Sequence, residues 1–242
     1  MKIIAKTDIG LVRSTNEDTY TYITKDENNF IAFVCDGMGG HLGGSYASSK
    51  TVEFINNAYE QLDPTKPIRN IGVWLFDVLQ QANDYILEQA LTNENLKGMG
   101  TTVTGVIMFN GELYYAHIGD SRIYQYNENE LEQITTDHTY VNTLLLNGLI
   151  TLKQARKHPK RHILTNALGI KRQVSVDIGQ IKIKENDKFL ICSDGLYNMI
   201  DGKKLHKVLT ENIDIEFKMN LLKDKALAAG GLDNITMILL EK

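Results

Sequence analysis

Apolar residues recur along this chain in two rhythms, one close to every second residue and one close to every 3.6 residues. The first rhythm indicates strands and the second indicates helices. Asn110-Gly111 separates two apolar runs and is a strong hairpin signal. The predicted strands are 2–7, 30–35, 102–109, 112–117, 122–126, 174–183, 188–192 and 235–240. The predicted helices are 52–62, 71–86, 203–209 and 216–229.

The order of these elements indicates the fold class. Two helical patterns follow one another after the strand at 30–35, and several strands then follow without a helix between them. This order favours an α+β fold with separate helical and sheet layers over a strictly alternating parallel sheet. With no low-complexity linker in the sequence, we expect residues 1–242 to form one domain.

The stretch from about 140 to 167 differs from the rest. It combines short helical patterns with one proline and a basic run: Lys153, Arg156, Lys157, Lys160 and Arg161. We interpret it as an insertion lying on the main body, while an ordinary solvated loop with surface charges would have the same composition.

Four aspartates occupy positions suited to metal-assisted phosphate chemistry. Asp36, Asp120 and Asp194 follow apolar runs and adjoin glycine, and Asp233 lies two residues before the last strand region. A carboxylate at a strand end is held rigidly, and the neighbouring glycine lets the chain turn away from it. Clustered carboxylates need a cation, and oxygen ligands favour Mg²⁺ or Mn²⁺ over zinc. If Asp36 ends a strand whose antiparallel neighbour follows Asp233, both carboxylates reach one edge of a sheet.

Other catalytic arrangements fit poorly. The glycines after Asp36 lack the last glycine of GxGxxG, and no GxxxxGK[ST] motif occurs. His158 and His162 have helical spacing, but Pro159 lies between them and the glutamate of HExxH is missing. There is no GxSxG elbow for a serine nucleophile and no CX₅R arrangement for a cysteine nucleophile. His117 is interpreted as a core histidine of a strand.

Composition adds limits on class and compartment. The chain has 242 residues, of which 43% are hydrophobic, and its net charge of −4 gives no indication of nucleic-acid binding. No stretch is typical of a signal peptide or of a membrane-spanning helix. Cys35 and Cys192 each lie in an apolar run outside any CxxC motif, so we expect buried thiols in a reducing cytoplasm.

The motifs together resemble those of the metal-dependent PP2C-type Ser/Thr protein phosphatases, from the first strand to the last. Each motif is short, but the ordered set is specific. The segments that carry the resemblance are Arg13 with Asn16-Glu17-Asp18, Asp36-Gly37-Met38-Gly39-Gly40-His41, Gly100-Thr101-Thr102, Gly119-Asp120-Ser121-Arg122, Ser193-Asp194-Gly195-Leu196 and Asp233-Asn234-Ile235-Thr236. DGMGG is similar to the bacterial branch of the family, where eukaryotic members commonly have DGHG, so Met38 stands in place of a histidine proposed there as the general acid.

The resemblance implies a four-layer α-β-β-α sandwich with two central antiparallel sheets and a binuclear Mn²⁺/Mg²⁺ site. By position it implies that Asp36 bridges both ions, that the Gly37 carbonyl joins one ion, and that Asp194 and Asp233 hold the other. Glu17 and Asp18 would act through coordinated water. Asp120 would share a third, weaker ion with Asp194, although local pairing with Arg122 or capping of a turn is an alternative. Arg13 would grip the substrate phosphate, and His41 is the local candidate for the general acid. The insertion at about 140–167 corresponds to the family's flap.

The resemblance also implies the activity and the partners. We expect hydrolysis of phosphoserine and phosphothreonine in proteins, an opposing Ser/Thr kinase as a partner, and a monomer without nucleic-acid binding or membrane insertion. Two alternatives stay open. One is a phosphohydrolase for small molecules, which the motifs do not distinguish. The other is a noncatalytic regulatory module, for which loss of a metal aspartate would be the mark, and none is missing.

Overall fold

The computed structural model describes residues 1–40, 42–65, 70–127 and 130–241. Within those ranges the strands are β1 (Lys2–Asp8), β2 (Asp18–Asp26), β3 (Asn29–Met38), β4 (Gly100–Thr101), β5 (Val103–Phe109), β6 (Glu112–Ile118), β7 (Arg122–Asn127), β8 (Glu130–Gln133), β9 (Asp177–Ile181), β10 (Lys188–Cys192) and β11 (Ile235–Glu241). The helices are α1 (Gly43–Gln61), α2 (Ile71–Thr92), α3 (Tyr140–Leu146), α4 (Leu152–Ala155), α5 (Asp194–Tyr197), α6 (Gly202–Thr210) and α7 (Ile215–Ala228), with a 3₁₀ turn η1 (Glu94–Leu96).

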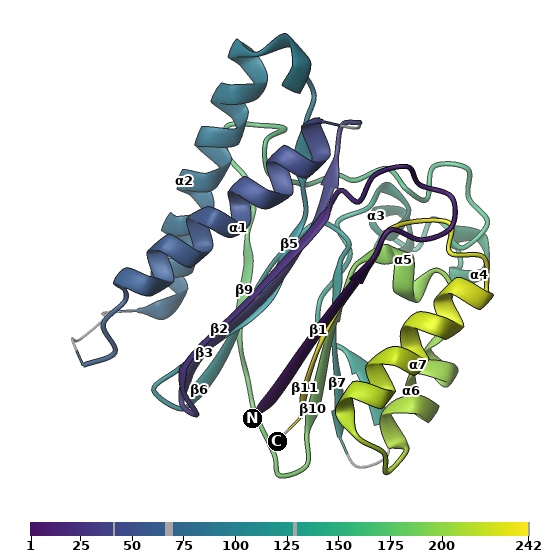
Figure 1. The fold of residues 1–242 in the computed structure, drawn as a ribbon. Helices are drawn as coiled ribbons and strands as arrows, with labels where there is room; N and C mark the ends of the chain where they lie inside the picture. The colour runs from purple at the N-terminus through teal and green to yellow at the C-terminus, as the bar shows by residue number, and fades with distance from the viewer. Residues whose placement is uncertain (41, 66–69, 128–129, 242) are drawn as a thin grey trace.

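The strands form two antiparallel sheets that face each other. One sheet has the order β1-β11-β10-β7-β8, and the other has the order β2-β3-β5-β6-β9 with β4 paired to β3. Helices α1 and α2 cover the outer face of the second sheet, and α6 and α7 cover the outer face of the first (Figure 1). The predicted α-β-β-α sandwich is therefore confirmed.

The alternation of side chains along the central strands explains the layers. In β3, Ile31 and Phe33 pack against the helices, whereas Phe30 and Ala32 point to the opposite sheet. Strand β10 repeats the pattern, because Phe189 lies between the sheets and Leu190 lies under helices. A strand buried on both faces is an almost continuous apolar run, which is why these two strands are recognisable in the sequence.

The structure adds strands that the apolar pattern does not reveal. Strand β2 is rich in threonine and tyrosine and lies at one edge of its sheet, and β8 is a short, mostly exposed edge strand. Neither β2 nor β8 carries a continuous apolar run. Each is a strand because it pairs with its neighbour, β2 with β3 and β8 with β7.

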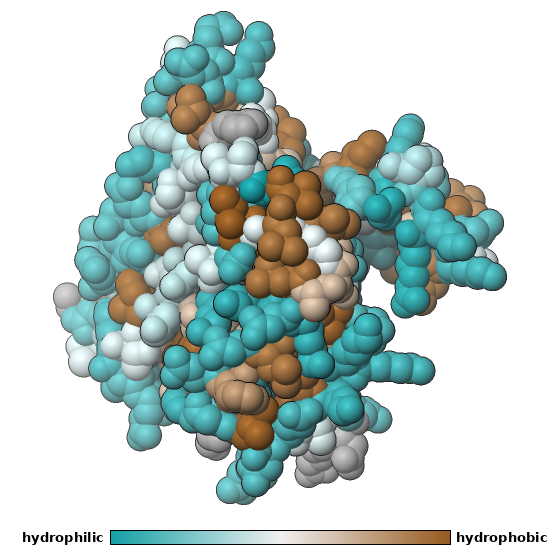
Figure 2. Space-filling model, turned by 45° about the vertical axis from the view of Figure 1, so that its right-hand side comes forward, coloured by the Kyte–Doolittle hydropathy of each residue, from teal (hydrophilic) through white to brown (hydrophobic). Residues whose placement is uncertain are grey.

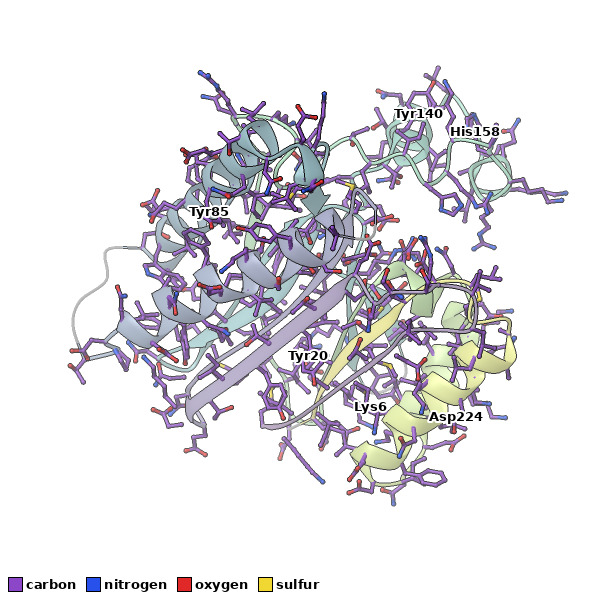
Figure 3. All side chains as sticks on the ribbon, turned by 45° about the horizontal axis from the view of Figure 1, so that its top comes forward. Lys6, Tyr20, Tyr85, Tyr140, His158 and Asp224 are labelled. Atoms are coloured by element: carbon purple, nitrogen blue, oxygen red, sulfur yellow. The ribbon has the colours of Figure 1, made fainter. Side chains whose placement is uncertain are left out.

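Residues 140–167 contain α3 and α4 and lie beside the sandwich. Thr139 caps α3, and Thr151 with Gln154 forms a capping box at the start of α4. Figure 3 shows Tyr140 and His158 next to each other on this segment, and their ring centroids are 5.9 Å apart. We refer to these residues as the 140–167 segment. Among the helices of the described ranges, none has the length and apolar character of a membrane span.

Candidate active site

A cavity of about 1710 Å³ opens where the ends of both sheets meet the 140–167 segment. The structure brings most of the predicted site residues to this cavity. Those that line it are Arg13, Glu17, Asp36, Gly37, Asp120, Asp194 and Asp233. His41 lies outside the described residues.

Asp36 lines the cavity and is fixed there by hydrogen bonds of its own backbone. Its N–H donates to Thr102 Oγ1 at 3.0 Å, and its carbonyl accepts from the N–H of Thr102 and the hydroxyl of Thr101. Strand β3 continues through Asp36 to Met38, where it pairs with β4. The Gly-Thr-Thr segment therefore positions this carboxylate, which is a role that the sequence motif alone did not specify.

The expectation that Asp36 and Asp233 share one sheet edge is wrong. Asp36 lies on β3, and Asp233 precedes β11, which belongs to the other sheet. The two carboxylates meet across the sandwich because both sheets end at the same cavity. Apolar periodicity reports that a strand is buried on both faces but does not report which sheet it joins.

Asp18 connects the two sheets below the cavity. Its carboxylate is buried and accepts from Ser193 Oγ at 2.7 Å, while Asp18 itself stands opposite Asp36 in the pairing of β2 with β3. Ser193 follows β10 of the other sheet and also binds Thr236. Asp18 therefore does not line the cavity but is tied to both sheets beneath it.

Close backbone approach places Glu17 and the Gly37 carbonyl region together. A Cβ atom on Gly37 would lie 2.2 Å from the Gly44 carbonyl oxygen, and one on Gly44 would lie 2.0 Å from Glu17 Oε2. Only glycine fits at both positions, which explains part of the glycine-rich sequence after Asp36. Asn234 Oδ1 accepts from the N–H of Glu17 at 2.9 Å and so ties this region to the start of β11.

Arg13 and Asp233 stand at the mouth of the cavity. Arg13 Nη2 lies 2.8 Å from Asp233 Oδ2, and the side chain of Arg13 is about half exposed. The Asn234 amide donates to the carbonyls of Ile9 and Thr15, which holds the loop that carries Arg13 against β11. Asn234 is thus a positioning residue whose role was not assigned from the sequence.

Asp120 is held by its neighbours through backbone contacts. Tyr197 donates its hydroxyl to the Asp120 carbonyl at 3.0 Å. The preceding Gly119 has φ +106, its N–H donates to His138 Nδ1 at 3.1 Å, and its carbonyl accepts from the His138 N–H. Arg122 is engaged elsewhere, because it makes a bidentate pair with Asp137 and stacks on the Tyr197 ring. The alternative of a local Asp120–Arg122 pair is therefore not supported by the hydrogen bonds at this site.

The carboxylates repel one another. Burial, and then the charges of Asp18 and Asp194, raise the pKa of Asp36 well above its ordinary value. Burial and the charge of Asp120 do the same to the pKa of Asp194. Burial also raises the pKa of Asp18 and that of Asp120, each to about 6. Such shifts identify a place where negative charge is concentrated and uncompensated.

The chemistry of the donors fits a hard divalent cation. Every candidate ligand offers oxygen, and the cavity contributes both carboxylates and the backbone at Gly37. In the described part of the chain, no group of three or more His, Cys, Asp or Glu side chains is arranged to hold an ion by itself. This is compatible with Mg²⁺ or Mn²⁺, because such cations bind through few carboxylates and keep several waters.

Comparison with known proteins gives a consistent result. The family model for protein phosphatase 2C matches residues 12–226. The serine/threonine phosphatase stp of Listeria welshimeri is 36% identical over 237 residues, which cover 98% of this chain and 94% of that protein. The S. agalactiae serine/threonine phosphatase superposes with a TM-score of 0.93 at 34% identity and 98% coverage of both chains. The catalytic domain of the phosphatase PstP, solved in complex with two manganese ions, superposes with a TM-score of 0.83 at 30% identity, covering 98% of this chain and 96% of that one.

Proposed function

Because the chain belongs to the protein phosphatase 2C family, we propose that it hydrolyses phosphoserine and phosphothreonine in proteins. The observation that carries this proposal is the buried Asp36, which stands among like charges at the base of the cavity while Arg13 stands at its mouth. A cation is needed at the base, and an anion is accepted at the mouth. A phosphate ester over metal ions satisfies both requirements.

The proposed metal ligands are those that the family resemblance implies, and all of them except Asp18 line the cavity. Asp36 would contact two ions, the Gly37 carbonyl one of them, and Asp194 with Asp233 the other. Glu17 and the buried Asp18 would act through water, and Asp120 with Asp194 would hold a third ion. When bound, Mn²⁺ or Mg²⁺ ions activate water for attack on phosphorus and offset charge on the phosphate oxygens.

Arg13 orients the phosphate. Its guanidinium can bind two phosphate oxygens at once and stabilise charge on them in the transition state. In the absence of other partners it pairs with Asp233 at 2.8 Å. As a metal ligand, Asp233 would give up this ion pair, and the Arg13 guanidinium would then be available for the phosphate.

His41 is the proposed donor of a proton to the leaving alkoxide. Replacing it by alanine is expected to slow hydrolysis of phosphothreonine more than that of para-nitrophenyl phosphate, whose leaving group needs no proton. Equal losses on the two substrates, measured as kcat under saturating Mn²⁺, would assign the proton transfer to another group.

The single-domain organisation and the role of the 140–167 segment as a flap belong to the same proposal. A segment that borders the cavity suits the recognition of phosphoprotein substrates. An opposing Ser/Thr kinase, a monomeric state and a cytoplasmic location are further parts of it. The last is supported by the unpaired, buried thiols of Cys35 and Cys192.

One experiment tests the activity directly. Purified protein is incubated with a phosphothreonine peptide, with Mn²⁺ and then with EDTA, and phosphate release is measured. We expect Mn²⁺-dependent release and its loss on chelation. Faster hydrolysis of metabolite phosphates than of any phosphopeptide would favour a small-molecule phosphohydrolase, and no release from either class would leave a noncatalytic module.

A further inference from the structure

Exposed apolar side chains gather on the two loops that carry Arg13 and Asp233. Leu11, Val12 and Leu232 are 67%, 64% and 56% exposed. Single exposed apolar residues need no explanation, but neighbouring ones next to a catalytic cavity mark a contact surface. Figure 2 shows apolar side chains collected on the face that carries these loops. We call Leu11, Val12 and Leu232 the apolar bank.

The apolar bank is formed in advance, because the two loops are joined. The N–H of Leu11 donates to the Gly231 carbonyl at 2.8 Å, and a Cβ atom on Gly231 would lie 3.1 Å from Leu11 Cγ. Gly10 has φ +79, and a Cβ atom there would lie 2.3 Å from the Asp233 carbonyl oxygen. The loops therefore cannot separate without breaking the contacts that also position Arg13 and Asp233.

A group of basic side chains on the 140–167 segment also borders the cavity. Arg156, Lys157, Arg161 and His162 line the same cavity. Burial and the nearby Arg161 lower the pKa of His162, while the charge of Asp233 opposes that shift. The basic side chains therefore lie within electrostatic range of Asp233, which follows Leu232 of the apolar bank in the chain. We call these four residues the basic bank.

A polypeptide bound with its phosphate at Arg13 passes both banks. Its side chains next to the phosphorylated residue would meet apolar carbon on one side and positive charge on the other. Acidic side chains are attracted by the basic bank, whereas the apolar bank offers them no partner, so they are accepted on only one side.

We propose that the cavity selects phosphopeptides with an apolar side chain on one flank of the phosphorylated residue and an acidic side chain on the other. This inference rests on the proposed phosphatase function and adds the class of sequence that the site accepts. It commits the apolar bank to one occupant, the substrate chain itself, because Leu232 lines the cavity together with Arg13.

The test uses phosphothreonine peptides of equal length. One carries two leucines before the phosphothreonine and two glutamates after it, and a second has the reverse order. In two further peptides serine replaces leucine, or glutamine replaces glutamate, in the better of the two orders. We expect one order to exceed its serine-substituted form by about 10-fold in kcat/KM, as burial of one or two apolar side chains predicts. We expect a smaller, salt-sensitive gain of about 3- to 5-fold from the glutamates.

Variants assign each preference to its bank. In the double variant Leu11→Ser/Leu232→Ser, the ratio of kcat/KM for the leucine and serine peptides should fall toward one. In Arg156→Gln/Lys157→Gln, the ratio for the glutamate and glutamine peptides should fall instead. Leu91→Ser is the control, because Leu91 is an exposed leucine on α2, and both ratios should keep their wild-type values. Each ratio is measured on one preparation, so a lower folded fraction cancels.

The possible results separate this inference from the proposed function. Equal kcat/KM for all four peptides overturns the selection of flanking residues and leaves the phosphatase activity in place. A leucine preference that survives Leu11→Ser/Leu232→Ser overturns the apolar bank. Absence of Mn²⁺-dependent release from every peptide and from para-nitrophenyl phosphate overturns the function itself.

Discussion

The base of the cavity and the 140–167 segment meet at one site but are held in different ways. Asp18 and Asp36 occupy paired positions on adjacent strands, and hydrogen bonds with Ser193 and Thr102 fix them. The 140–167 segment consists of two short helices and loops with exposed cations such as Lys157 and Lys160. The comparison suggests that rigid strand ends carry the chemistry and that the outer segment carries recognition.

The two regions also differ in charge. The base is a cluster of carboxylates that raise one another's pKa, and the 140–167 segment contributes the cations Arg156, Lys157 and Arg161 to the same cavity. Concentrated like charge in a buried place lowers the stability of the metal-free protein in exchange for metal affinity. Substitutions in the base should therefore lower activity without lowering stability. Substitutions in the 140–167 segment should change the rates on some substrates and not on others.

The largest effect is expected for Asp36→Asn. We expect kcat to fall by at least about 1000-fold, because the proposed shared ligand of two ions is lost. In EDTA the variant should melt at or above the wild-type temperature, since one repelling charge is removed. Calorimetric Mn²⁺ titration, thermal melting and phosphopeptide kinetics measure the three properties. Unchanged Mn²⁺ affinity with full activity would contradict the assignment, and a lower melting temperature in EDTA would contradict the repulsion.

The buried His117 makes the stability of the layer beneath the cavity depend on pH. Burial and the neighbouring His138 lower the pKa of His117 from 6.5 to about 4, against weaker opposing effects of Thr136, Asp177 and Asp137. The unfolded chain binds the proton of His117 more tightly than the folded protein does. The contribution of neutral His117 to the unfolding free energy is therefore complete above pH 6.5 and is lost as the pH falls toward 4. Between pH 7 and 4.5 the lost unfolding free energy amounts to about 2 kcal/mol.

His117→Asn removes that titration and keeps a polar group near Thr104, to which His117 Nδ1 is bonded at 2.8 Å. Urea unfolding of both proteins in EDTA at pH 7 and pH 4.5 gives the comparison. We expect the acid-induced loss of unfolding free energy to be smaller in the variant. An identical loss in both proteins would show that His117 does not titrate in this range.

Arg13→Ala should lower kcat/KM by about 100-fold on every phosphoester, because the group that grips the phosphate is missing. Arg13→Lys is the matched variant, since it keeps the charge but loses the two-pronged contact, and it should recover only part of the loss. Steady-state kinetics on a phosphopeptide and on para-nitrophenyl phosphate provide the measurement. A loss confined to one substrate would move Arg13 from phosphate binding to peptide recognition.

His138 links the base to the loop leading into the 140–167 segment. Its Nδ1 accepts from Gly119 and from Asn166, and its Nε2 lies 3.0 Å from Asp177 Oδ2. His138→Ala leaves buried donors without an acceptor and should lower the unfolding free energy by about 2 kcal/mol. Because Gly119 precedes Asp120, the Mn²⁺ concentration for half-maximal rate should also rise.

Amide exchange at Gly119 in EDTA provides a readout that is independent of activity. It should accelerate in His138→Ala and stay slow in Asp177→Asn, which keeps His138 and its acceptor nitrogen. Slow exchange at Gly119 in both variants would show that His138 does not hold this loop. Asp120→Ala is the reference for the Mn²⁺ dependence of the rate. This variant should retain two tightly bound ions and have a lower kcat.

The smallest effect is expected in the 140–167 segment. Replacing Lys157, Lys160 and Arg161 by alanine should reduce the kcat/KM ratio of an acidic phosphopeptide to para-nitrophenyl phosphate by about 5-fold, and added salt should reduce the wild-type ratio in the same direction. Both ratios come from steady-state kinetics at low and high ionic strength. A uniform loss on both substrates would mean that the segment supports the base rather than recognition.

The sequence predicted the elements with continuous apolar runs better than those without. Strand β10 was found at its observed bounds and β3 in its buried part, because both strands are buried on both faces, whereas the end of β3 from Asp36 to Met38 was missed. Strand β2 was missed, since its Thr-Tyr alternation at a sheet edge is only half-buried. His138 and Asn234 were not recognised as positioning residues, because their partners lie far away in the chain.

The sequence by itself determined which residues carry the proposed chemistry. Asp36, Asp120 and Asp194 are recognisable because carboxylate, glycine and apolar run are neighbours in the chain. The tertiary structure decided how they meet. Asp36 and Asp233 come from different sheets, and the buried Asp18 is joined to Ser193 of the opposite sheet. Strand pairing between distant segments sets these contacts, and local periodicity contains no information about the partner of a strand.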